Sequence, residues 1–215
     1  MSAKRPGAVR TLPDVVAHPE ELDAGEITDG QAVEDVRVTQ GDFSAKAVRQ
    51  LVIRRSVTED VSFAQAHVQT ARLRDARFVR CDLSNAVMRG LEATRVEFVD
   101  CRLIGLNAVE CRLEDVLLER CDLRYAQLKD GSARRSDFVD THLEEADLRA
   151  VNLENTRWTR SNLSRADLTG ARLAGADLRG AEIEGMIVGA ADLAGAIVSP
   201  SQAMEFARLL GLIIR

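Results

Sequence analysis

The residues best suited to chemistry are four cysteines and three histidines. Cys81, Cys101 and Cys121 follow one another at intervals of twenty residues, and Cys111 lies midway between the last two. Thiolates can bind zinc, but zinc sites usually contain closely spaced ligand pairs, and the sequence has no Cys-x-x-Cys. The regular spacing favours a column of small buried side chains, so we expect neither a metal site nor a cofactor site.

Nucleophilic catalysis would require a serine or cysteine held beside a histidine. His18, His67 and His142 are far apart in the repeat described below, and Ser62 and Ser161 occupy positions predicted to point inward. Acidic residues are plentiful, but an uninterrupted repeat offers no cleft in which to shift their pKa values. We therefore predict that the protein is not an enzyme.

Charged residues indicate the architecture, because they recur every twenty residues with alternating sign. If one coil of chain takes twenty residues, adjacent coils lie about 4.8 Å apart and opposite charges meet. Each exposed pair contributes only ~0.2–1 kcal/mol, so we interpret these ladders mainly as devices that fix the register between coils. One ladder comprises Asp60, Arg80, Asp100, Arg120, Asp140 and Arg160, and the other comprises Arg55, Asp75, Arg95, Asp115 and Arg135.

A five-residue unit underlies this period of twenty. Residues 166–170, with the sequence ADLTG, show it plainly, and the frame continues without a shift through 33 units centred from Val38 to Val198. The central residue is usually Leu or Phe, and the residue two positions earlier is usually small. A period of five matches neither helix nor strand, but it matches a chain that turns a corner every five residues with these two side chains inward. We expect an inward column at Phe78, Phe98, Leu118, Phe138 and Trp158, with Trp158 marking a local swelling of the bore.

These units resemble the pentapeptide-repeat family, whose motif is a small residue, Asp or Asn, Leu or Phe, and then two variable residues. The resemblance covers residues 36–198 and implies an all-β fold, a right-handed quadrilateral β-helix of about eight coils. We divide the chain into an N-terminal tail and cap (1–35), a pentapeptide-repeat β-solenoid (36–198), and a short C-terminal cap (199–215) formed by an α-helix and a strand.

The residues after the last repeat predict this helix. Ser199-Pro200-Ser201 is typical of a helix start, residues 202–210 are predicted to be helical, and Gly211 ends the helix. Residues 212–214 are predicted to form a short apolar strand. Similar family members form a two-fold dimer at this end, which implies a homodimer here, and the alternative is a monomeric cap. The implied dimer contacts are Met204, Phe206, Leu209, Leu210, Leu212, Ile213 and Ile214.

The composition limits the possible partners and the expected cellular location of the protein. The net charge of −5 argues against direct nucleic-acid binding. No apolar run approaches 18 residues and the N-terminus lacks an apolar signal core, so we expect no membrane span and a cytoplasmic location. Residues 1–10 are expected to be disordered. The acidic segment 11–42 is expected to cap the first coil, with docking on a partner as the alternative.

A rod without a cleft leaves its outer sides and ends for function, so we predict a non-catalytic protein-binding scaffold whose partner the sequence does not name. Some members of the similar family imitate duplex DNA, bind DNA gyrase and protect it from quinolones or related toxins, and the resemblance implies this as an alternative. A DNA mimic should be acidic over a wide surface, whereas here one side is acidic and the opposite side is basic. The acidic residues expected to contact a partner are Asp82, Asp122, Glu144, Glu145, Glu182 and Glu184.

Overall fold

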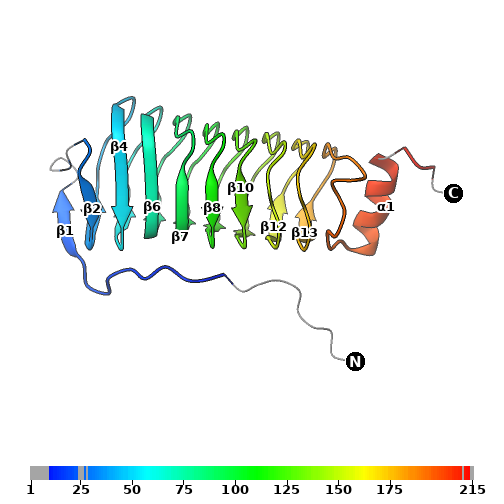
Figure 1. Cartoon of the computed structure of the whole chain (residues 1–215), viewed down its shortest axis with the longest axis horizontal. Helices are drawn as coiled ribbons and strands as arrows, with labels where there is room; N and C mark the ends of the chain where they lie inside the picture. The colour runs from blue at the N-terminus through cyan, green and yellow to red at the C-terminus, as the bar shows by residue number, and fades with distance from the viewer. Residues whose placement is uncertain (1–9, 24–26, 28, 210, 214–215) are drawn as a thin grey trace.

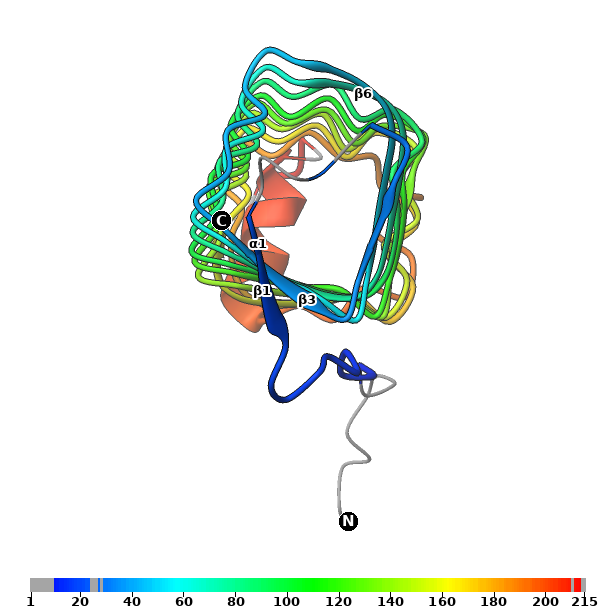
Figure 2. The same ribbon diagram turned by 90° about the vertical axis from the view of Figure 1, so that its left-hand side faces the viewer.

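The computed structural model describes residues 10–23, 27, 29–209 and 211–213. These residues form a parallel β-sheet that winds into a solenoid and ends in a helix. Figure 1 shows the coils stacked along the long axis, and Figure 2 shows their four-sided outline. The predicted four-sided β-solenoid with a C-terminal helical cap is therefore confirmed. The elements are β1 (Glu20–Asp23), β2 (Ala32–Glu34), β3 (Val36–Thr39), β4 (Ala47–Arg54), β5 (Val57–Glu59), β6 (His67–Val79), β7 (Glu92–Val99), β8 (Arg112–Glu114), β9 (Leu117–Glu119), β10 (Ser132–Arg134), β11 (Asp137–Val139), β12 (Arg157–Asn162), β13 (Asp177–Glu182) and α1 (Pro200–Leu209).

Adjacent coils pair in the predicted twenty-residue register. Strand β6 sets Leu73 against Ala93 of β7, and strand β11 sets Phe138 against Leu118 of β9. Isolated bridges such as Asp82 with Arg102 continue the same offset between the longer strands. Residues twenty apart are therefore vertical neighbours, as the alternating charges predicted.

Most fifth residues turn a corner in the left-handed conformation. Between Asp35 and Arg165 the non-glycine residues at this position have φ values from 45° to 62°, except Gln50 and Thr70, which lie within the long strands β4 and β6. An isolated L-residue in this conformation costs roughly 1–2 kcal/mol, so the stacking of each corner on its neighbours must compensate. The corners direct these side chains away from the bore, which places the charge ladders on the outside.

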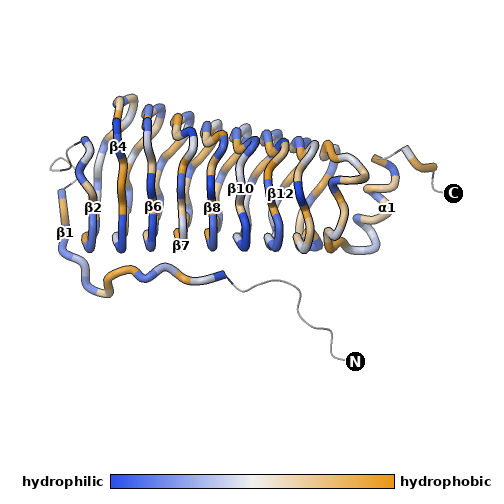
Figure 3. The backbone as a smooth tube through the Cα atoms, in the orientation of Figure 1, coloured by the Kyte–Doolittle hydropathy of each residue, from blue (hydrophilic) through white to orange (hydrophobic). Residues whose placement is uncertain are grey.

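The first and third residues of each unit fill the interior, and Figure 3 shows the resulting alternation of apolar and polar residues along each coil. The expected aromatic column is buried and stacked. The ring centroids of Phe78 and Phe98 are 5.0 Å apart, and those of Phe138 and Trp158 are 3.8 Å apart. A gap of about 20 Å³ lined by Leu, Phe and Ala remains in the bore. The interior is thus a packed core that leaves no channel for a ligand.

Strand pairing is irregular beside Trp158, in the coil where we expected a swelling. Strands β12 and β13 pair Arg157 with Asp177 and then Thr159 with Gly180, a shift of one residue, before the original offset returns. A Cβ added to Gly180 would lie 2.6 Å from the carbonyl oxygen of Trp158. Glycine is therefore required here by the close approach of two backbones.

Both charge ladders form as predicted, with each arginine binding the aspartate twenty residues earlier. Arg80 donates from Nε and Nη2 to Asp60 at 2.8 Å each, and Arg95 donates in the same way to Asp75 at 2.6 Å each. The arginine hydrogen bonds hold the pKa of Asp60 and of Asp75 below its ordinary value. Bidentate pairs of this kind have a fixed geometry, which suits them to hold register.

The two ends differ from the middle of the rod. Strand β2 already pairs with β4 at the twenty-residue offset, so the coil begins before residue 36, and β1 pairs with β3 on the outer edge at an offset of sixteen. At the other end, Leu212 and Ile213 lie outside any strand, and Ile214 is outside the described residues. The short strand predicted after the helix is therefore absent from the described residues. No helix in the described parts of the chain is long and apolar enough to cross a membrane.

Candidate partner-binding surfaces

The second residue of several units has a structural role on the acidic side. The Oδ1 atom of Asp82 accepts a hydrogen bond from the backbone N–H of Ser84 at 2.8 Å, and Asp122 accepts one from the N–H of Arg124 at 3.2 Å. These contacts satisfy backbone donors at the turn. Both aspartates are half-buried, so only part of each carboxylate is available to a partner.

Three of the predicted contact acids have basic neighbours. Asp122 pairs with Arg124 at 2.7 Å, and Glu145 pairs with Arg165 at 3.0 Å. Glu144 lies 3.4 Å from the Nδ1 atom of His142, and its Oε2 atom is buried without a hydrogen-bond partner among the described residues. Asp122 and Glu145 are therefore engaged in intramolecular ion pairs, which makes their carboxylates less available to a partner.

The remaining predicted acids, Asp82, Glu182 and Glu184, form no ion pair with any described residue. Glu182 and Glu184 line a shallow hollow of about 450 Å³ between the last coils and helix α1. Arg179 and Glu205 also line this hollow. The structure thus separates Asp82 from this pair, and the six predicted residues form no single compact patch.

Helix α1 is tied to the last coil through Gln202. The Oγ atom of Ser199 accepts the N–H of Gln202 at 3.2 Å, while the Gln202 side chain accepts the N–H of Ser199 at 2.9 Å, which is a capping box. The Nε2 atom of Gln202 also donates to the carbonyl oxygens of Leu178 at 2.6 Å and Ala181 at 2.8 Å. The predicted serine cap is confirmed, and the glutamine additionally closes the open edge of the solenoid.

The predicted dimer residues fall into two groups. Phe206 is buried in the core of its own chain, so it belongs to the cap and is not free to contact a second copy. Met204, Leu209, Leu212 and Ile213 are exposed, and Leu212 lines an apolar groove of about 270 Å³. The side chains of Leu210 and Ile214 lie outside the described residues.

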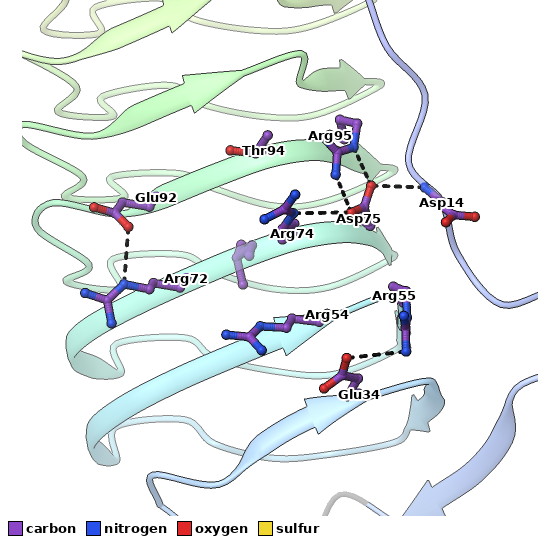
Figure 4. A pocket seen from close by; sticks show the side chains of 11 residues that line it. Asp14, Glu34, Arg54, Arg55, Arg72, Arg74, Asp75, Glu92, Thr94 and Arg95 are labelled. Atoms are coloured by element: carbon purple, nitrogen blue, oxygen red, sulfur yellow. Dashed lines mark hydrogen bonds and ion pairs between the residues drawn. The ribbon is translucent and has the colours of Figure 1, made fainter.

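A larger hollow of about 680 Å³ lies on the basic side, over β4, β6 and β7 (Figure 4). Arg54 lines it and forms no ion pair with the described residues, whereas Arg72 pairs with Glu92 at 3.2 Å. Arg74 lies 3.6 Å from Asp75. The hollow is open and polar, and one cation in it remains unneutralised.

A segment that the sequence did not predict borders this hollow. Residues 10–16, which we call the strap, leave β1 and run along the outside of the coils toward the middle of the rod (Figure 1). The N–H of Asp14 donates to Asp75 at 3.1 Å. Arg10 Nη2 lies 2.9 Å from Glu97, and Arg10 Nε lies 3.7 Å from Asp137. The strap thus crosses several coils and contacts one of the two charge ladders.

The cysteine column is buried, as its spacing predicted. The Sγ atoms of Cys81, Cys101 and Cys121 contact backbone carbonyl oxygens at 3.3–3.5 Å. A side-chain hydrogen bond with Cys121 raises the pKa of Cys101 to about 12, and burial raises the pKa of Cys111 to about 12. The described residues contain no group of three or more His, Cys, Asp or Glu that could hold a metal ion. The four cysteines are therefore small buried fillers of the bore.

Comparisons with known proteins identify the family. A model of the pentapeptide repeat region matches residues 71–148, and a model of eight pentapeptide repeats matches residues 146–185. No curated protein matches the chain. Among solved structures, the plasmid-mediated fluoroquinolone resistance protein QnrB1 is 22% identical, with 91% of this chain and 98% of that chain covered and a TM-score of 0.35. HetL, a pentapeptide repeat protein involved in heterocyst differentiation regulation in the cyanobacterium Nostoc, is 19% identical, with 85% and 90% covered and a TM-score of 0.26. The two family models together span more than half of the sequence, and the chain belongs to the pentapeptide-repeat family.

Proposed function

We propose that the protein is a non-catalytic scaffold that binds another protein through its outer sides and its ends. The observation that carries this proposal is the packed, uninterrupted solenoid, whose bore retains a gap of only about 20 Å³. The groups best suited to nucleophilic chemistry, the thiols, are buried inside it, and the pKa values of Cys81, Cys101 and Cys111 are raised. Side chains available to other molecules therefore belong to rigid, flat surfaces, which suit recognition of a macromolecule.

The acidic side and the C-terminal end are the proposed contact regions. Glu182 and Glu184 are exposed, line one hollow and have no intramolecular cation among the described residues, so they are the strongest of the six acidic candidates. Free thiols in place of disulfides support a cytoplasmic location for this interaction.

Affinity capture from the source cell, followed by reversal of charge, tests the scaffold. The bait is the full chain, and the variants are Glu182→Lys with Glu184→Lys, compared with Glu110→Lys as a control on another side. We expect a specific protein to be retained by the wild type and by the control, and to be lost with the double variant. Retention of nothing above the level of an unrelated bait contradicts the scaffold proposal, and equal retention by every variant excludes the acidic hollow.

We also propose that the exposed apolar residues of the C-terminal end form a two-fold homodimer contact. Leu212 is 62% exposed and Ile213 is 83% exposed, beside the apolar groove. Sedimentation equilibrium at micromolar concentration should give twice the chain mass of 23.6 kDa, and Ile213→Asp should give the single chain mass. A wild-type protein that sediments as one chain contradicts the dimer.

Binding to DNA gyrase or a related type II topoisomerase is the second candidate. The rod without projecting loops favours it, whereas the ion pairs Asp122–Arg124 and Glu145–Arg165 reduce the acidic surface that a DNA mimic needs. The test measures gyrase supercoiling with and without a quinolone in the presence of micromolar protein. Protection of supercoiling would support this candidate, and unchanged supercoiling under both conditions removes it.

A further inference from the structure

The two charge ladders share one design but differ in what covers them. In each, arginine binds the aspartate of the preceding coil, and all members occupy corners with φ near 50–60°. The strapped ladder is Asp35, Arg55, Asp75, Arg95, Asp115 and Arg135, and the open ladder is Asp60, Arg80, Asp100, Arg120, Asp140 and Arg160. The strap lies on the first ladder, and the hydrogen bonds and ion pairs found for residues 10–16 in the described part of the chain do not reach the second.

The strap matches the period of its ladder. The backbone N–H of Asp14 donates to Asp75 at 3.1 Å, and that of Thr11 faces Asp115 and helps to lower the pKa of this carboxyl. The two donors are three residues apart, which in an extended chain spans roughly 10 Å. The two acceptors are two coils apart, which also spans roughly 10 Å. An extended chain that lies along the ladder therefore meets one aspartate with every third N–H.

The exposed fractions of the aspartate side chains show that the open ladder can still accept backbone N–H groups. Asp75 and Asp115 are each 8% exposed beneath the strap, whereas Asp60, Asp100 and Asp140 are 49%, 41% and 35% exposed. A carboxylate has about four lone-pair sites, and the arginine of the next coil takes about two of them. In the strapped ladder, the Oδ1 atom of Asp75 accepts both Arg95 Nε and the N–H of Asp14. The same acceptor positions on the open ladder face solvent.

We propose that the open ladder binds an extended segment of a partner protein, whose backbone N–H groups at every third residue donate to Asp60, Asp100 and Asp140. This inference rests on the proposed scaffold function, because it specifies one surface through which such a scaffold acts. The three aspartates span four coils, so the bound segment comprises about seven residues. Recognition through the backbone places few demands on the partner's side chains, and the strap is the intramolecular example of such a ligand.

A peptide with the sequence of residues 10–17 is a suitable probe, because the strap already fits this geometry. Fluorescence anisotropy with the labelled peptide and the full chain should show saturable binding. A second peptide, N-methylated at the residues equivalent to Thr11 and Asp14, keeps every side chain but lacks the two donors. We expect its affinity to fall at least tenfold, and equal binding of the two peptides overturns the proposal.

Variants of the full chain locate the site. Asp100→Ala and Asp60→Ala should each weaken peptide binding about tenfold, since each removes a charge-assisted acceptor. The matched control Asp115→Ala lies on the strapped ladder and should change it less than twofold. Alanine is tolerated at such corners, because Ala45 and Ala150 already occupy them with φ of 55° and 56°. An unchanged affinity in both open-ladder variants, or no saturable binding up to about 1 mM peptide, refutes this site. Either result leaves the scaffold proposal to the capture experiment, which does not depend on this peptide.

Discussion

The strap should loosen when Arg10 is shortened. The Arg10 side chain is 8% exposed and lies between Glu97 and Asp137, which are 14% and 15% exposed. A hydrogen bond to a charged group contributes about 1.5–3 kcal/mol, so Arg10→Ala should raise the equilibrium constant for strap opening roughly tenfold to a hundredfold. Glu97 retains Arg77 at 3.5 Å, and Asp137 retains Arg157 at 2.6 Å, so the solenoid itself should remain intact.

Native-state amide hydrogen exchange measures this opening directly, because the N–H of Asp14 is bonded to Asp75 and that of Thr11 faces Asp115. We expect both amides to exchange faster in Arg10→Ala by the factor above, with core amides such as that of Val116 unchanged. Arg120→Ala, which removes an arginine from the open ladder, is the matched control and should leave the strap amides unaffected. Unchanged exchange of Thr11 and Asp14 in Arg10→Ala would refute the docking of the strap through this side chain.

The remaining predictions concern the cap, the core, the ladders and the thiols. Gln202→Ala leaves the carbonyls of Leu178 and Ala181 without a donor, so the free energy of unfolding in urea should fall by about 2–4 kcal/mol. The control Ser199→Ala should lower it by about 1 kcal/mol, and equal losses in the two variants would contradict the bridging role of the glutamine. Phe138→Ala should cost about 3–5 kcal/mol in the same assay, because it removes a fully buried ring that stacks on Trp158, and a loss below 1 kcal/mol would exclude tight packing there. The arginine partners lower the pKa of Asp60, Asp75, Asp100 and Asp140 below 3.8. The contribution of these four ion pairs to stability should therefore be complete above about pH 5 and be lost as the pH falls through 3.8 and below. A free energy of unfolding that is constant between about pH 5 and pH 3 would contradict this. The four thiols should not react with a disulfide reagent at pH 8 until the protein is denatured, and rapid labelling of the native protein would contradict their burial.

The sequence predicted the coil and its register because both depend on side chains that repeat. Alternating charges twenty residues apart and the five-residue frame are sufficient to place Phe98 over Phe78 and Arg80 over Asp60. The strap escaped prediction because backbone N–H groups make most of its contacts, and these carry no side-chain pattern. The Arg10 side chain, which pairs with Glu97, was the sequence signal available for this contact.

The candidate site was predicted less completely than the fold. The pairing of Glu145 with Arg165 follows from the twenty-residue register, whereas the pairing of Asp122 with Arg124 in the same coil depends on side-chain conformation. Likewise Phe206 shares the apolar character of Met204 and Leu209, and only the orientation of helix α1 shows that it faces the core. The strand predicted after Gly211 is not formed by Leu212 and Ile213, and Ile214 lies outside the described residues.

The docking of the strap amides on the ladder carboxylates can be observed by NMR at the amide protons themselves. The amide proton shifts of Thr11 and Asp14 should be followed in the folded protein as the pH is lowered. The hydrogen bonds from Arg95 and from the strap amide lower the pKa of Asp75. Burial acts to raise the pKa of Asp115, but the contacts with Arg135 and Thr11 outweigh burial, so this pKa is also lowered. Both amide protons should therefore titrate with midpoints below 3.8. Amide shifts that do not titrate, or that titrate at the ordinary value of an exposed aspartate, would contradict the docking of the strap on its ladder.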